Sequence, residues 1–183
     1  MIKNVEKTKN HCLMVLSKKK DHICDYLPNH IVSVEKWARK IMKHHPGANK
    51  QIILLSVWLH DIGHAFLNHD EHHIESEKEA RRFLKKIKIN PREIEQIAHC
   101  VRAHRCKDIM PRTIEAKILA AADSASHFTD GAYMDMLING YKRFVLKKIE
   151  RDYRDVGLFP KLKKEITPIY KAWKKLSRVY PNQ

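Results

Sequence analysis

A histidine and an aspartate follow a nearly uninterrupted apolar stretch in the segment LLSVWLHDIGH, residues 54–64. An unpaired carboxylate is costly to bury, so Asp61 needs a cationic partner or a helix end beside it. A divalent metal ion would supply the positive charge and would take the neutral imidazole of His60 as a second ligand. The pair could equally be a satisfied core histidine and an aspartate at a helix end, and taken alone it leaves both explanations open.

Two ligands are too few to hold a catalytic metal ion, so further ligands must come from other segments. His30 stands one residue before the apolar stripe of residues 31–41, and Asp123 interrupts the apolar segment KILAAADSAS. Each also has an ordinary explanation, because His30 could lie on the surface and Asp123 could bond a nearby helix end. Thirteen histidines, five of them within residues 60–73, favour the metal hypothesis, since imidazole is the commonest metal ligand among side chains.

The segments that carry these residues show the periodicity of helices. Apolar residues recur at steps of three and four across residues 31–41, where we expect the first amphipathic helix to begin near His30. Residues 51–59 are apolar on all sides, as in a buried central helix, and Gly63 is expected to cap its end. Further helices are predicted around residues 80–87, 91–101, 114–122, 134–149 and 162–173. No segment has a convincing strand pattern, so the sequence predicts an all-α fold.

The length and charge of the chain limit its class. With 183 residues it is long enough for one domain with a sizeable core. Its net charge of +15 suits phosphorylated small molecules, nucleic acid or an anionic surface, although solvated lysine-rich helix faces explain the charge as well. No apolar run approaches the roughly 20 residues of a membrane span or forms the core of a signal peptide. We therefore expect a cytoplasmic protein with reduced cysteines and no membrane partner.

The C-terminal part is strongly basic. Residues 142–183 carry 13 Lys and Arg against 4 Asp and Glu, a local charge of +9. Apolar residues continue to recur at helical spacing through this segment. We therefore expect a C-terminal basic helical segment that packs on the rest of the chain, rather than a flexible arm.

The order and spacing of these residues resemble the HD superfamily of metal-dependent phosphohydrolases, all-helical proteins named for the His-Asp pair. The resemblance spans about residues 25–130, and its matching segments are NHIVSVEKWARKI, LLSVWLHDIGH, HHIESEKEARRFL, IEQIAHCVRAHR and IEAKILAAADSASHF. The dipeptide alone is weak evidence, whereas the ordered set on matching helices is strong. The resemblance implies a single HD-type helical bundle, with a motif-bearing core at about 25–130 and helices 131–180 packed on it.

The resemblance also implies a metal site. Its first divalent ion would have four ligands: His30, His60, Asp61 and Asp123. Some branches, including the HD-GYP type, add two histidines and hold a second ion. His72 fits their pattern, because Ser76 and Ala80 follow it at the required intervals, whereas His73 does not. Helical phase puts His104 rather than His99 on the inward face. His72 and His104 could instead bond the substrate phosphate in a one-metal site, and both explanations remain open.

Other residues near the motifs could take part in the chemistry. His64 occupies a position that some nucleotidase members fill with a catalytic acid, and it could also contact phosphate. The predicted catalytic residues are Asp61, His64, His72 and His104. Further candidates for proton transfer or phosphate binding are Asp70, Glu71, Arg105 and Lys117. A rival structural zinc site would use His11, Cys12, His22, Cys24, His99, Cys100 and Cys106, but their spacings match no common zinc pattern.

The resemblance implies hydrolysis of a phosphomonoester or phosphodiester bond in a nucleotide or related small molecule, with water activated by a metal ion. The nitrogen and oxygen ligands suit Mn, Fe, Co, Ni, Mg or Zn, with one or two ions per chain. A first alternative is a nuclease acting on single-stranded nucleic acid, which the charge favours and the scarcity of aromatic residues outside the core positions disfavours. A second is a non-catalytic nucleotide sensor, against which the complete ligand set argues.

Overall fold

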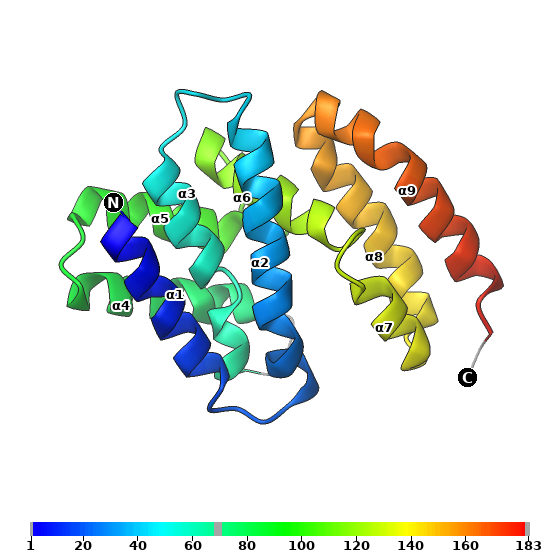
Figure 1. Ribbon diagram of the computed structural model, residues 1–183, viewed down its shortest axis with the longest axis horizontal. Coiled ribbons are helices and arrows are strands. Elements are labelled where there is room, and N and C mark those ends of the chain that lie inside the picture. Colours follow the sequence, from blue (N-terminus) through cyan, green and yellow to red (C-terminus); the bar gives the residue numbers. More distant parts are fainter. Residues whose placement is uncertain (1, 68–70, 182–183) are drawn as a thin grey trace.

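The structure, a computed structural model, describes residues 2–67 and 71–181 (Figure 1). Within these ranges every regular element is a helix, so the predicted all-α class is confirmed. The elements are α1 (Ile2–Leu16), α2 (His22–Met42), α3 (Lys50–Leu59), the 3-10 helix η1 (Ile62–Ala65), α4 (His72–Lys86), α5 (Pro91–Ala103), α6 (Ile114–Ser126), α7 (Ala132–Ile138), α8 (Lys142–Asp155), the 3-10 helix η2 (Val156–Leu158) and α9 (Pro160–Val179). None of these helices is long and apolar enough to cross a membrane.

The helices form two groups joined by α6. Figure 1 shows α1, α3, α4 and α5 on one side of α2, and α7, α8 and α9 on the other. Helix α6 packs against α2, α3 and α5 in the first group and against α8 and η2 in the second. This position explains why α6 consists mostly of small apolar residues. Residues 118–126 are all buried, and alanine side chains allow neighbouring helices to approach closely. Asp123 therefore lies inside the protein where the two groups meet.

Three local expectations from the sequence were wrong. Helix α2 begins at His22 rather than near His30, because the side chain of Asp21 accepts a hydrogen bond from the backbone nitrogen of Cys24 and caps the helix there. The continuous helix expected over residues 134–149 is divided into α7 and α8 at Gly140, whose φ of +81° glycine adopts at little steric cost.

Gly63 is not the left-handed cap that the sequence suggested. It lies inside η1, and the positive-φ glycines are elsewhere in the chain. The reason for glycine is a close approach: a Cβ at this position would lie 2.2 Å from the carbonyl oxygen of His72 and 2.6 Å from the backbone nitrogen of Ser76. Gly63 thereby lets η1 lie directly against the first turn of α4.

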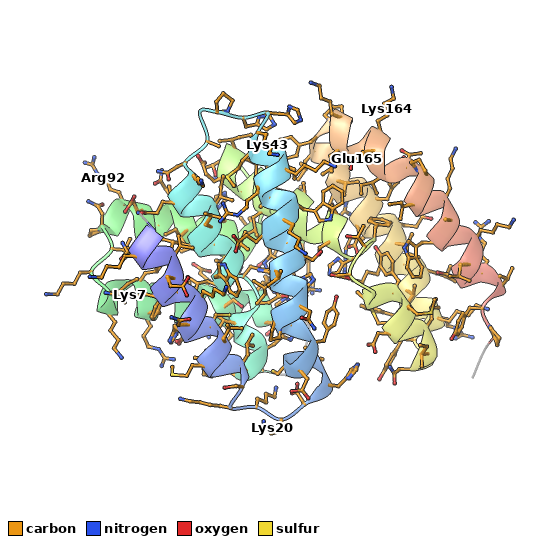
Figure 2. The ribbon with its side chains drawn as sticks, viewed as in Figure 1. Lys7, Lys20, Lys43, Arg92, Lys164 and Glu165 are labelled. Atoms are coloured by element: carbon orange, nitrogen blue, oxygen red, sulfur yellow. The ribbon has the colours of Figure 1, made fainter. Side chains whose placement is uncertain are left out.

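Much of the positive charge points to solvent. Figure 2 shows Lys7, Arg92 and Lys164 extending outward from three different helices, and all three side chains are exposed. Solvated basic helix faces therefore account for part of the net charge of +15.

The basic C-terminal segment forms the hairpin of α8 and α9. Val145 and Ile149 of α8 and Ile166 of α9 are fully or almost fully buried. Helix α9 also contacts the segment that follows α6, because the indole nitrogen of Trp173 donates to the carbonyl oxygen of Phe128 at 3.0 Å. Glu165 of α9 additionally forms an ion pair with Lys40 of α2.

Deleting α9 by truncation after Asp155 is expected to lower the free energy of unfolding by about 3–6 kcal/mol. The estimate assigns about 1.5–3 kcal/mol to the lost burial of each of Leu162 and Ile166. Thermal melting followed by circular dichroism measures the loss of stability, and binding of a hydrophobic dye measures the apolar surface that becomes exposed. Removal of residues 181–183 is the control. Unchanged melting after truncation would show that α9 is an independent arm. The single-domain organisation stays a prediction until this experiment is done.

Candidate metal centre

The four first-ion candidates come from three helices and converge in the interior. His30 lies in the third turn of α2, His60 and Asp61 follow the last residue of α3, and Asp123 lies on α6. All four are buried. The second pair joins them, because His72 is the first residue of α4 and His104 directly follows α5. The structure thus brings together all six residues for which the sequence suggested metal binding.

Asp61 lies between two pairs of imidazoles. Its Oδ2 is 3.3 Å from Nε2 of His60 and 3.6 Å from Nε2 of His30. Its Oδ1 is 3.2 Å from Nε2 of His72 and 3.5 Å from Nε2 of His104. One carboxylate therefore presents a separate oxygen to each pair.

Asp123 closes the cluster on the side of α6. Its Oδ1 lies 3.1 Å from Nε2 of His30 and 3.8 Å from Nε2 of His60. The same oxygen is 3.6 Å from Nε2 of His127, one helical turn further along α6. His127 is thus a member of the cluster that the sequence analysis did not identify.

The backbone fixes the orientation of two rings. His60 Nδ1 lies 2.8 Å from the carbonyl oxygen of Val57, and His104 Nδ1 lies 2.7 Å from that of Val101. A carbonyl oxygen only accepts, so each Nδ1 carries a proton, and in the neutral ring each Nε2 has its lone pair toward the cluster. This is the arrangement that positions imidazole for metal binding.

Carboxylates orient two further rings. His30 Nδ1 lies 2.8 Å from Oδ2 of Asp130, and His127 Nδ1 lies 3.0 Å from Oδ2 of Asp152. The two imidazoles stack with centroids 4.9 Å apart and planes 9° from parallel. Asp152 is buried and also accepts from the hydroxyl of Tyr133 at 2.8 Å. Both rings are therefore held so that Nε2 faces Asp123.

The donor set fits a divalent cation. Nε2 of His60 and Oδ1 of Asp61 are buried and have no hydrogen-bond partner within the described residues, and such orphaned groups are costly unless something satisfies them. In the described part of the chain, ligating atoms within 4.8 Å of one another form three groups: His30 with His60 and Asp61, Asp61 with His72 and His104, and His30 with Asp123 and His127. These buried histidine and aspartate clusters are compatible with divalent metal binding.

The charges of the cluster also call for a cation. Burial alone would raise the pKa of Asp61 and Asp123, but the neighbouring imidazoles hold both pKa values well below the ordinary range. Burial disfavours the imidazolium of His30, yet Asp123 and the other carboxylates outweigh it and raise the pKa of His30 to about 10. The carboxylates are thus ionised and need positive charge nearby. Bound metal would supply that charge and displace protons from the imidazoles.

His64 borders the cluster without joining the ligand groups. Its ring stacks on that of His72, with centroids 3.9 Å apart. Burial lowers the pKa of His64 to about 4, so the imidazole is neutral near pH 7. Its Nδ1 is buried and has no hydrogen-bond partner in the described part of the chain. A neutral ring at this place can bond a substrate, but it is a poor proton donor.

Other sequence candidates lie away from the centre or outside the described residues. His99 is half-buried rather than solvent-facing, because its Nε2 accepts from the backbone nitrogen of Arg112. His73 instead pairs with Asp108, at 3.2 Å. Arg105 lines the cavity above the cluster, whereas Lys117 and Glu71 are not part of its wall. Asp70 lies outside the described residues. The four cysteines are buried and free, and among the described residues no metal-compatible group contains one.

Three functional candidates, His127, Asp130 and Asp152, were missed. The interval of four residues between Asp123 and His127 puts both on one face of α6, and this signal was available in the sequence. Asp130 and Asp152 contact the cluster only through the tertiary fold. No local pattern marks them.

The cluster lies at the base of a cavity of about 920 Å³. The side chains of His30, Asp61, His72, His104 and Asp123 reach its wall, together with residues of α7 and α8. The buried ligands are therefore accessible to a small molecule.

Comparison with known families agrees with this geometry. A family model described as HD domain matches residues 28–126, more than half of the chain. The match includes all six histidines and aspartates of the divalent-ion site proposed from the sequence, and it ends just before His127. Neither the search of curated proteins nor the search of solved structures gave a match.

Proposed function

Because the chain belongs to the HD domain family, a superfamily of metal-dependent phosphohydrolases, we propose that it cleaves a phosphomonoester or phosphodiester bond of a nucleotide or related small molecule. The observation that carries the proposal is Asp61, buried at the base of a cavity with one oxygen toward each pair of imidazoles. If these histidines served only to pack the core, four imidazoles would not need to surround the single carboxylate of Asp61.

We propose that His30, His60, Asp61 and Asp123 hold the first ion, and that Asp61, His72 and His104 hold a second. When bound, a divalent metal supplies Lewis acidity, which makes water nucleophilic near neutral pH and offsets negative charge on a phosphoryl group. The shared position of Asp61 favours two ions over one, because each carboxylate oxygen already faces its own pair of rings.

The remaining groups bind and orient the substrate in this proposal. Arg105, Lys148 and Arg151 line the cavity and attract a phosphate. Neutral His64 donates a hydrogen bond from its ring N–H to the phosphate, from the side of His72.

The test is a panel of phosphomonoesters, cyclic nucleotides, nucleoside triphosphates and short single-stranded oligonucleotides, each assayed with Mn, Fe, Co, Ni, Mg and Zn. Hydrolysis of at least one small phosphate ester is expected, with loss of activity in a chelator and recovery on adding metal. Cleavage of oligonucleotides alone would instead support the nuclease. Tight nucleotide binding without hydrolysis under any metal would support the sensor and contradict the proposal.

A further inference from the structure

The cavity above the metal centre has a second wall that lies outside the segment matched to the HD family. Residues of α7 and α8 form it, and both helices follow residue 126, where the match ends. At about 920 Å³ the cavity has the size of pockets that enclose a whole organic ligand rather than a phosphate alone. A ligand that fills the cavity therefore contacts α7 and α8 as well as the first turns of α2.

One face of α8 changes from aromatic to cationic along its length. Besides Asp152 and Asp155, four cavity-lining residues follow one another at steps of three or four: Tyr141, directly before α8, and Phe144, Lys148 and Arg151 within it. Such spacing puts them on a single helical face. The packing face of the same helix carries Val145 and Ile149, which are buried. The aromatic side chains are thus free of the core and available to a ligand.

The cationic end of this face adjoins the metal centre. Lys148 Nζ lies 3.0 Å from Nδ1 of His127 and 3.0 Å from Oδ2 of Asp152. Nε2 of His127 lies in turn 3.6 Å from Asp123. Arg151 approaches the other oxygen of Asp152, at 3.5 Å. A phosphate held over the metal centre would therefore have this end of α8 beside it.

The aromatic end lies one to two turns further away. At about 1.5 Å per residue, Phe144 and Tyr141 are about 6 and 10 Å along the helix from Lys148. Their side chains are 49% and 60% exposed, and Ile23 of α2, at 43%, lines the same cavity. Large apolar side chains left exposed together in a concave site mark a surface for an apolar ligand group.

We propose that this face of α8 selects the leaving group of the substrate. The substrate class is a phosphate ester whose leaving group carries a flat aromatic ring, which packs on Tyr141 and Phe144 while the phosphate lies near Lys148. The inference rests on the proposed hydrolytic function for the placement of the phosphate, and it makes the C-terminal helices, rather than the HD segment, the source of substrate selectivity.

The test measures binding of phosphonates, whose P–C bond is not an ester bond and is not hydrolysed. Isothermal titration of the full chain with Mn²⁺ compares phenylphosphonate with methylphosphonate. Stacking on an aromatic side chain predicts that phenylphosphonate binds about ten-fold more tightly. The double variant Tyr141→Ala/Phe144→Ala is expected to bring the ratio of the two affinities close to one. Phe66→Ala is the matched control, because Phe66 is 46% exposed and lines a different cavity.

Each outcome decides the inference. A wild-type ratio near one, a ratio unaltered in the double variant, an equal loss in Phe66→Ala, or no binding of either phosphonate would overturn it. The proposed function fails separately, if no member of the ester panel is hydrolysed with any metal. Selective phosphonate binding by a protein without hydrolysis would leave the aromatic site standing and remove only the catalytic assignment.

Discussion

Replacing Asp61 with alanine should remove all stoichiometrically bound metal and lower hydrolysis by at least about 10³-fold, the scale of loss when a group that directly stabilises the transition state is removed. Asp61 belongs both to the group with His30 and His60 and to the group with His72 and His104, so neither of these groups survives its loss. Because Asp61 follows the last residue of α3, the helical content of the variant should stay close to that of the wild type.

Elemental analysis of the purified variant measures the metal, and circular dichroism measures the helices. Asp108→Ala is a matched control, since Asp108 also pairs with a histidine, His73, but away from the cluster. Full metal content in Asp61→Ala would mean that the assignment of the centre is wrong.

The same measurement separates two ions from one. With two ions, His72→Ala and His104→Ala should each reduce metal content by half, because both face the same oxygen of Asp61. If these histidines contact only the phosphate, metal content stays whole and KM rises, since ground-state binding is weakened. Unchanged metal content and unchanged kinetics would make them ordinary core histidines.

The second large effect is expected for Gly63→Ala. A Cβ on residue 63 would lie 2.2 Å from a carbonyl oxygen and 2.6 Å from a backbone nitrogen of α4, far inside van der Waals contact. Backbone atoms cannot rotate away, so α4 must shift as a whole. Overpacking of this kind costs about 1–3 kcal/mol or more, and we expect the melting temperature to fall by about 2–12 °C.

The shift should also reach the metal centre. The displaced atoms belong to His72 and to Ser76, whose Oγ accepts a hydrogen bond from the backbone nitrogen of Gly63 at 2.8 Å. Partial metal loss should therefore accompany the loss of stability. Gly47→Ala provides the control, because a Cβ there would meet nothing within 4 Å. Equal melting temperatures and equal metal content for both variants would refute the close-packing explanation.

Helical phase and order along the chain were enough to predict most of the centre. His104, unlike His99, shares a helical face with apolar residues, and in the structure it lies beside Asp61. The small residues that follow His72 at intervals of four and eight distinguish it from His73. The structure gives these residues a physical reason: Ser76 and Ala80 are fully buried, and Ser76 contacts η1 directly.

Features that depend on three-dimensional contacts could not be predicted. Asp130 bonds His30 across 100 positions of sequence, and nothing near either residue signals the pair. The break at Gly140 could not be predicted, because apolar residues recur at helical spacing on both sides of it. The role of Gly63 was misread for a similar reason, since a glycine after a helix more often marks a cap than a close approach.

Asp152, which lies beside His127 at the metal centre, is synthesised after all the proposed metal ligands. During translation, all the proposed metal ligands leave the ribosome before α8 does, because the last of them is Asp123. Asp152 and Lys148 of α8 lie beside Nδ1 of His127, whose Nε2 is directed at Asp123. A nascent chain can therefore assemble a metal-binding core early, but it acquires the oriented His127 and the cationic wall only after the second helical group has docked.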